Sequence, residues 1–327
     1  SNSVGERLGR KDPQRVEAVA QGAWTHPDAG LSSRANGDQH ASHEDVAADL
    51  VPWGAGFMVA VADPTTDSSA QLDGLVAPSS GVALQAADLS KRFGGIAALT
   101  DVGISVPSGA IVGLIGPNGA GKSTCLSALA GSLRPEQGTV ELMGIDVTNL
   151  DAASRAAAGL ARTFQLPRIP HHMTVLDVAA LGAYRRGSSG ALRAVFGATG
   201  AERRGLERAG MESLEMTGIA HLHALPANQL STGEQKMLEL ARALASAPEV
   251  LLADEPAGGL FDEEIGRLGE VLAELARCGL AVVLVEHHMD LVMEVCSQIV
   301  VLNEGRVIAV GSPEDVQTNE EVLDAYL

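Results

Sequence analysis

The sequence predicts an α/β fold with an inserted helical subdomain, and three observations lead to this prediction. A continuous apolar run, Ala110 to Ile115, stops at a glycine and leads into a helical stretch, Lys122 to Ala130, which makes a strand–loop–helix unit. Two later runs, Val250 to Ala253 and Leu280 to Val285, have the length and apolar character of buried strands. Between them and the first unit, residues 164–244 place Arg, Glu and Ala along amphipathic helical faces.

Shorter strands are predicted on either side of this frame. Val82 to Ser90 alternates like a half-buried strand, and Gly103 to Val106 has the character of another. Val300 to Leu302 and Val307 to Val310 read as a terminal hairpin that turns at Asn303 to Gly305.

Residues 1–81 differ from the rest in composition. They are rich in Ala, Gly, Asp, Ser and His, and the stretch 28–43 is typical of a linker or of disorder. We expect at most a short helix within 12–20 and partial order within 51–61. Three origins stay open for this segment: a cloning remnant, a processed end, or the tail of an upstream domain. The predicted organisation is a low-complexity or partly disordered extension, 1–81, followed by one domain, 82–327, with its helical subdomain at about 165–245.

The composition narrows the class of protein and its compartment. The 327 residues are 46% hydrophobic, which is enough for a large core, and carry a net charge of −18. So acidic a chain is a poor candidate for docking on nucleic acid or anionic lipid, and no nucleic-acid partner is expected. The three cysteines show neither paired nor metal-ligand spacing, and no apolar run is long enough to span a bilayer. We therefore expect a cytoplasmic protein that reaches a membrane only through a partner.

A phosphate-binding loop follows the first buried strand. The sequence GPNGAGKST matches the pattern G-x-x-x-x-G-K-[ST], in which glycines let backbone N–H groups converge on phosphate oxygens at the start of a helix. We expect Lys122 to reach the β- and γ-phosphates and the Ser123 hydroxyl to bind Mg²⁺. The predicted nucleotide-binding residues of the loop are Gly116, Pro117, Asn118, Gly119, Ala120, Gly121, Lys122, Ser123 and Thr124.

Two carboxylates follow the strand Val250 to Ala253. Asp254 stands where that strand ends, at the sheet edge that faces the phosphate loop in such folds, and this position suits a Mg²⁺ ligand. Glu255 is the candidate to orient or deprotonate the attacking water. An adjacent Asp and Glu after an apolar run are common on solvated loops, so the assignment depends on the phosphate loop upstream.

The sequence LSTGEQ, Leu230 to Gln235, resembles the signature of the ATP-binding cassette (ABC) ATPases. The resemblance covers 82–327 and implies a P-loop NTPase fold, with a RecA-like core, an antiparallel β subdomain and the helical insert. It also implies that Ser231, Thr232, Gly233 and Glu234 contact ATP held by an opposing subunit. The same residues also read as an ordinary helix cap, since Ser-x-x-Glu is a capping box.

Three single residues gain a role only through this resemblance. Gln165 matches the glutamine that contacts Mg²⁺ or water and reports to the membrane partner. His287 matches the histidine that contacts the γ-phosphate, and Phe93 resembles the aromatic residue that stacks on adenine. Three positions depart from the family pattern: Thr232 replaces a glycine, Glu234 replaces a glutamine, and Phe261 stands where a polar residue usually makes a contact across the dimer.

Several stretches narrow the resemblance to the importers of branched-chain amino acids, and in particular to the ATPase with the longer insert. They are KRFGGIAAL, LARTFQLPRIPHHMTVLDVAALG, EPAGGL, LVEHHMDLVMEVC and GSPEDVQTNEEVLDAYL. Three alternatives stay open: an importer of urea or short-chain amides, a soluble ABC ATPase without a transport role, and a subunit that binds ATP without turnover. An ATPase subunit does not contact the transported solute. Its sequence therefore indicates the solute only through common descent with the ATPases of other importers.

The resemblance also implies a mechanism with named partners. ATP and Mg²⁺ are the cofactors, and a second ABC ATPase subunit, identical or paralogous, completes each site. Permease subunits that dock near Gln165 to Thr174 hold the chain on the inner face of the membrane, and a solute-binding protein acts indirectly.

Overall fold

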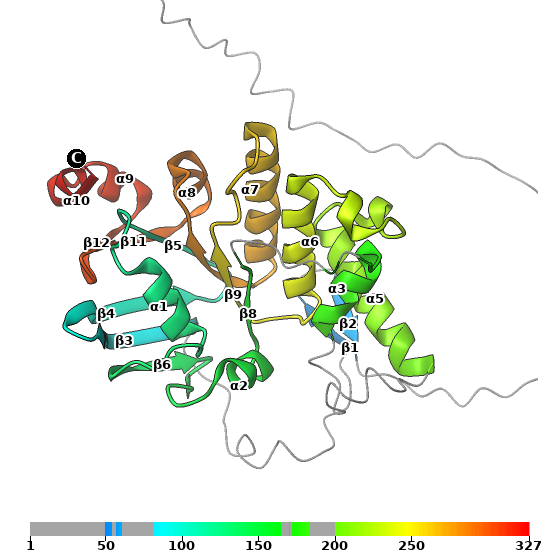
Figure 1. Cartoon of the computed structure of the whole chain (residues 1–327), viewed down its shortest axis with the longest axis horizontal. Helices are drawn as coiled ribbons and strands as arrows, with labels where there is room; N and C mark the ends of the chain where they lie inside the picture. The colour runs from blue at the N-terminus through cyan, green and yellow to red at the C-terminus, as the bar shows by residue number, and fades with distance from the viewer. Residues whose placement is uncertain are drawn as a thin grey trace, which may run out of the picture. The chain divides into compact units, whose positions relative to one another are not determined.

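The computed structural model describes residues 50–53, 57–60, 81–164, 170, 172–183 and 200–326. Within this part of the chain, two sheets and a group of helices build the fold (Figure 1). The short strands β1 (Leu50–Trp53) and β2 (Phe57–Ala60) pair as an antiparallel hairpin, which begins one residue before the stretch 51–61 where partial order is expected and otherwise lies in it. The helix expected in 12–20 lies outside the described residues.

A six-stranded sheet forms the centre, in the order β12-β11-β5-β10-β9-β8. Its strands are β5 (Ile111–Ile115), β8 (Leu160–Arg162), β9 (Val250–Asp254), β10 (Ala281–Val285), β11 (Gln298–Asn303) and β12 (Arg306–Gly311). All neighbours are parallel except β11 and β12, which form the predicted terminal hairpin. Because both faces of the sheet are covered, β5 and β10 are buried at every position, which explains their continuous apolar sequences.

A second, antiparallel sheet has the order β4-β3-β6-β7. Its strands are β3 (Val82–Phe93), β4 (Ile96–Pro107), β6 (Gln137–Leu142) and β7 (Ile145–Asp146). The strand predicted from Val82 to Ser90 is confirmed, and it continues to Phe93.

Helices cover the central sheet and form a group at its β8 edge. They are α1 (Lys122–Leu129), α2 (Ala152–Ala157), α3 (Val175–Leu181), α5 (Gly200–Met216), α6 (Thr232–Leu244), α7 (Asp262–Arg277), α8 (Met289–Val295), α9 (Pro313–Gln317) and α10 (Glu320–Tyr326), with 3₁₀ turns η4 (Ala220–Leu222) and η5 (Ala227–Gln229). In Figure 1, α3, α5 and α6 pack together beside β8, and they make the predicted helical subdomain. The fold class predicted from the sequence is confirmed.

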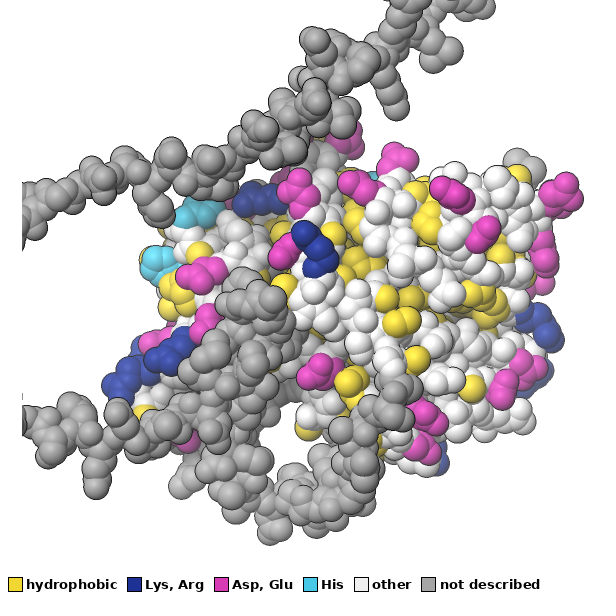
Figure 2. All heavy atoms as spheres, turned by 180° about the vertical axis from the view of Figure 1, so that it is seen from behind, with side chains coloured by type: hydrophobic (Ala, Val, Ile, Leu, Met, Phe, Trp, Pro, Cys, Tyr) yellow, Lys and Arg dark blue, Asp and Glu magenta, His cyan; other side chains and the backbone are white. Residues whose placement is uncertain are grey.

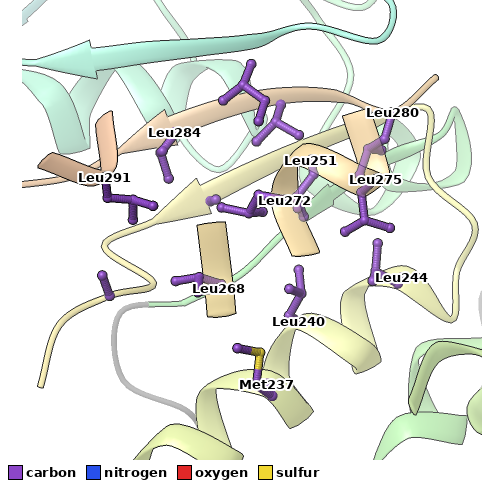
Figure 3. Packing of buried hydrophobic residues seen from close by; sticks show 14 of the residues in the cluster. Met237, Leu240, Leu244, Leu251, Leu268, Leu272, Leu275, Leu280, Leu284 and Leu291 are labelled. Atoms are coloured by element: carbon purple, nitrogen blue, oxygen red, sulfur yellow. The ribbon is translucent and has the colours of Figure 1, made fainter. Parts of the chain in front are cut away.

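The core divides into two clusters because successive residues of a strand point to opposite faces of the sheet. Leu284 belongs to the cluster that lies between the sheet and helices α6, α7 and α8. Leu240, Leu268 and Leu272 belong to the same cluster (Figure 3). Its neighbour Val283 joins the other cluster, which fills the space between the central sheet, α1 and the antiparallel sheet.

A buried cation fixes the C-terminal end of α1. Arg155 is fully buried, and its guanidinium donates to the carbonyl oxygens of Ala128 at 2.7 Å, Leu129 at 2.8 Å and Thr148 at 2.9 Å. Burial lowers the pKa of Arg155, but the last carbonyls of a helix are favourable partners for a positive charge. This contact holds in place the helix whose other end carries the phosphate loop.

The acidic surplus lies on the surface. Figure 2 shows Asp and Glu side chains spread over the face that it presents, in keeping with the net charge of −18. Any site that binds an anion must therefore supply its positive potential locally.

Candidate nucleotide-binding site

The loop between β5 and α1 has a backbone that requires glycine at its two ends. Gly116 has φ +149°, and a Cβ there would lie 2.0 Å from the carbonyl oxygen of Leu302. Gly121 has φ +103°, and a Cβ there would lie 2.7 Å from the carbonyl oxygen of Ala98. Gly121 is also the residue that precedes α1, and no side chain caps this helix. The first N–H groups of α1 are thus left for an anion.

Lys122 lies in the centre of the loop. Its side chain is buried, and Nζ donates to the carbonyl oxygens of Gly116 at 2.7 Å and Pro117 at 3.0 Å. Burial lowers the pKa of Lys122, and the nearby charge of Glu255 opposes this shift. A partly desolvated ammonium group attracts phosphate more strongly than one in bulk water.

A cleft of about 470 Å³ opens over the loop. It brings together seven of the predicted loop residues, 118–124, with Glu255 and His287, two of the three predicted catalytic residues; the third, Gln165, lies outside the described residues. Its wall also contains Ile96, Ala97, Ala98 and Glu304, which the sequence reasoning missed. Glu304 lies in the predicted turn between β11 and β12. A glutamate in a turn does not by itself indicate a binding site, so the two predicted strands beside it were the only available signal for its position.

Glu255 and His287 follow two adjacent parallel strands, β9 and β10. The N–H of Glu255 donates to the carbonyl of Val285 at 2.8 Å, which ties the loops together, and Glu255 has φ +48°. Its Oε1 lies 2.9 Å from Nε2 of His287. A carboxylate held in this way beside an imidazole can accept a proton from a water molecule in the cleft.

Asp254, the predicted Mg²⁺ ligand, ends β9 and forms an ion pair with Arg162. Its Oδ2 lies 2.9 Å from Nη2 of Arg162, and both side chains are largely buried. Nε of Arg162 has no hydrogen-bond partner among the described residues. The sequence reasoning missed Arg162, although its strand β8 pairs directly with β9.

The residues proposed for Mg²⁺ fit its chemistry. Mg²⁺ prefers hard oxygen ligands and usually keeps several waters and substrate phosphates, so it needs few protein ligands. The Ser123 hydroxyl and the Asp254 carboxylate supply such oxygens, and Ser123 lines the cleft. Among the described residues there is no cluster of three or more His, Cys, Asp or Glu side chains able to hold a metal. Gln165, the third predicted ligand, lies outside the described residues.

Phe93 ends β3 and is about half exposed, at 51%. It is paired across the turn with Ile96, which lines the cleft, so the strand reaches the edge of the cleft. The ammonium group of Lys91 lies 5.8 Å from the centre of its ring. Stacking of Phe93 on adenine stays a prediction.

The predicted signature begins α6 as a capping box. The Ser231 hydroxyl accepts a hydrogen bond from the N–H of Glu234 at 3.3 Å, and the Glu234 carboxylate accepts one from the N–H of Ser231 at 2.7 Å. A Cβ at Gly233 would lie 2.1 Å from Oε1 of Glu264, so any other residue at this position would require the Glu264 side chain to move. Ser231, Thr232, Gly233 and Glu234 do not line the cleft. The helix-cap interpretation is correct, and the contact with an opposing subunit stays a prediction.

Two of the departures from the family pattern, Thr232 and Phe261, lie on neighbouring segments. Phe261, which precedes α7, is 80% exposed, and its N–H donates to Glu264 at 2.9 Å. Cγ2 of Thr232 lies 3.8 Å from the position that a Cβ on Gly259 would take. The loop that carries Phe261 thus packs against the start of α6.

A buried lysine links α6 to the loop that carries Glu255. Nζ of Lys236 donates to the carbonyl oxygen of Glu255 at 3.3 Å. Burial lowers the pKa of Lys236, and the charge of Glu286 is the main opposing influence. Glu286 is itself buried and accepts hydrogen bonds from the N–H groups of Ala257 at 2.6 Å and His287 at 3.0 Å. These bonds fix the backbone on both sides of the Glu255–His287 pair.

We expect Arg162→Gln to lower kcat/KM for ATP by about tenfold and to raise the Mg²⁺ concentration needed for half-maximal activity, because Asp254 loses the cation that holds it. Steady-state ATPase assays over a Mg²⁺ series measure both. Arg203→Gln is the control, since Arg203 makes an exposed ion pair with Glu207 and its loss should change neither value. A wild-type Mg²⁺ dependence in Arg162→Gln would show that the ion pair does not position Asp254.

Within the described part of the chain, no helix has the length and apolar character needed to cross a membrane.

Comparison with known proteins places this site in a family. A model described as "ABC transporter" matches residues 99–258, and one described as "Branched-chain amino acid ATP-binding cassette transporter" matches 306–327. The chain is 36% identical over 249 residues to the high-affinity branched-chain amino acid transport ATP-binding protein BraF of Pseudomonas aeruginosa, which covers 75% of this chain and 97% of BraF.

Two solved structures of ATP-binding cassettes are also similar to this chain. A nucleotide-free ATP-binding cassette from an ABC transporter has a TM-score of 0.68 and 30% identity, covering 75% of this chain and 99% of that one. A dimeric bacterial ABC transporter cassette has a TM-score of 0.61 and 26% identity, covering 70% and 98%. The chain therefore belongs to the ATP-binding cassette family, as an ATP-binding and ATP-hydrolysing subunit of a transporter.

Proposed function

We propose that this chain powers the import of branched-chain amino acids. The observation that carries the proposal is the agreement between the two family matches. The cassette match covers most of the nucleotide site, and the branched-chain match covers the C-terminal segment. BraF, which is named for branched-chain amino acid transport, is similar over almost its whole length.

The catalytic roles that we propose combine the site geometry with the family resemblance. The loop 116–124 would bind the phosphates, with Lys122 on the β- and γ-phosphates. Glu255 would take a proton from the attacking water while His287 holds the carboxylate and faces the γ-phosphate. Mg²⁺, held by Ser123, Asp254 and Gln165, would neutralise developing charge on the phosphates. Phe93 would stack on the adenine ring.

The assembly proposed is a dimer of ATPase subunits bound to permease subunits. Ser231, Thr232, Gly233 and Glu234 would cover ATP bound to the other subunit, which is either a second copy or a paralogue; a similar cassette has been solved as a dimer. Permease subunits near Gln165 to Thr174 would hold the chain at the inner face of the cell membrane, and a solute-binding protein would act through them. In this arrangement 82–327 is the ATPase domain.

Uptake by cells tests the proposal. We expect that removing the gene abolishes most uptake of radiolabelled leucine, isoleucine and valine at low concentration. The wild-type gene should restore it, and Glu255→Gln should not. Urea and acetamide uptake, measured in the same strains, discriminates the related importers. Loss of amide uptake with normal leucine uptake would overturn the proposed solute while leaving the ATPase assignment intact.

A further inference from the structure

Two buried charged residues converge on the loop that carries Glu255. This loop joins β9 to α7, and Glu255 is its first residue. Nζ of Lys236, on α6, donates to the carbonyl oxygen of Glu255 at 3.3 Å. Oε1 of Glu286, which follows β10, accepts a hydrogen bond from the N–H of Ala257 at 2.6 Å. The two side chains thus hold the loop on both sides of Pro256, one from the helical subdomain and one from the central sheet.

The backbone of Glu255 needs this support. Its φ of +48° lies in the left-handed region, which residues with a side chain seldom adopt, and such a conformation persists where the surrounding structure fixes it. Glu286 also accepts a hydrogen bond from the N–H of His287 at 3.0 Å. One carboxylate therefore holds the segments of both Glu255 and His287, whose side chains lie 2.9 Å apart.

Lys236 and Glu286 act from the interior and not from the cleft. Their exposed fractions are 8% and 1%, and neither is among the described residues that line the cleft. Buried charges are costly unless an opposite charge or hydrogen bonds compensate them. The charge of Glu286 is the main influence that opposes the effect of burial on the pKa of Lys236, so each residue helps to keep the other charged. Any effect of this pair on ATP must pass through the backbone that it holds.

Helix α6 is a firm base for the lysine. Met237, Leu240 and Leu244 of this helix belong to the core cluster that also contains residues of β9 and β10 (Figure 3). Lys236 comes directly before Met237, so its contact with the Glu255 loop starts from a segment that is packed on the sheet.

We propose that Lys236 and Glu286 are positioning residues that set the Glu255 loop for hydrolysis, and that α6 thereby takes part in hydrolysis of the ATP bound to its own chain. This role differs from the one proposed for the first residues of α6, which concerns ATP on an opposing subunit. A general base has to lie within hydrogen-bond reach of the attacking water, and small displacements of reacting groups cost up to about 100-fold in rate. The proposal rests on the catalytic role proposed for Glu255 and is independent of the transported solute.

Lys236→Met and Glu286→Gln test the two contacts. Met has no ammonium group, and Gln has a single acceptor oxygen, so it cannot accept from both Ala257 and His287. We expect each variant to lower kcat by about tenfold. The Kd for ATP should stay within about twofold, because the phosphate loop is unchanged. Turnover at saturating ATP and equilibrium binding of ATP, on the purified full chain or on its complex with a paralogous subunit, measure the two values.

The double variant tests whether the two residues work as a unit. Because both hold the same loop, Lys236→Met combined with Glu286→Gln should lose about as much kcat as either single variant, about tenfold and not about 100-fold.

Leu240→Ala is the control for general stability. Leu240 is buried on α6 within the core cluster, so this change should lower the midpoint of thermal unfolding while kcat, measured well below that midpoint, stays within about twofold of the wild type. The proposal is overturned if either single variant keeps the wild-type kcat, if its loss appears in the Kd for ATP instead, or if the two losses multiply. It is also overturned if Leu240→Ala lowers kcat as much.

Glu255→Gln in the same assay separates this proposal from the one on which it rests. Unchanged turnover in Glu255→Gln would remove the catalytic role of Glu255 itself. Loss of turnover in Glu255→Gln with wild-type turnover in Lys236→Met would overturn only the positioning role.

Discussion

Replacing Glu255 by Gln reduces steady-state ATP turnover by about 100-fold or more and leaves ATP binding intact. The reason is that an amide has nearly the same shape as the carboxylate but cannot accept the proton of the attacking water; general-base catalysis contributes about 10²- to 10⁴-fold. Gln can still accept a hydrogen bond from Nε2 of His287, so the 2.9 Å contact does not have to be lost. Phosphate release and equilibrium binding of ATP measure the two quantities separately.

The matched control is Glu304→Gln, which changes the other carboxylate that lines the cleft. Glu304 lies in the β11–β12 turn, and β5 separates β11 from β10, the strand that precedes His287. The ATP turnover of Glu304→Gln should therefore stay within a few-fold of the wild type. We also expect ATP to trap a dimer of Glu255→Gln, alone or with a paralogous subunit. Unchanged turnover in Glu255→Gln would remove Glu255 from the catalytic role.

Replacing Lys122 by Ala weakens ATP binding by about 100-fold or more, since two or more charge-assisted hydrogen bonds to phosphate are lost. Stability should change little. The ammonium group is buried, and among the described residues it donates only to the backbone carbonyls of Gly116 and Pro117, so its desolvation offsets much of what those bonds contribute.

Equilibrium dialysis with labelled ATP and thermal unfolding measure affinity and stability in the same samples. Arg277→Ala is the control for net charge, because Arg277 makes an exposed ion pair with Glu274, and it should bind ATP as the wild type does. ATP affinity within threefold of wild type in Lys122→Ala would mean that the phosphates bind elsewhere.

The fold was predictable where burial dictates the sequence on both faces of an element. β5, β9 and β10 are continuous apolar runs because helices or the second sheet cover both sides of them. The short strands β7 and β8 carry no comparable pattern, since two or three residues are too few to show a period. Their pairing is set by neighbours distant in sequence.

The site was predictable where a backbone constraint leaves a local motif. Gly116 and Gly121 must be glycine, so the loop appears in the sequence as a pattern. Arg162, Lys236 and Glu304 have no such motif, because long side chains reach their partners from many backbone positions.

The most direct test of the composite site is an experimental structure of Glu255→Gln with Mg²⁺ and ATP, solved with its partner ATPase subunit if the chain does not dimerise alone. We expect a triphosphate wrapped by the N–H groups of 118–124, with Lys122 on the β- and γ-phosphates. We also expect Ser231 and Gly233 of the facing subunit, or their equivalents, over the γ-phosphate. A triphosphate bound away from this loop, or bound there with no second subunit facing it, would contradict the account.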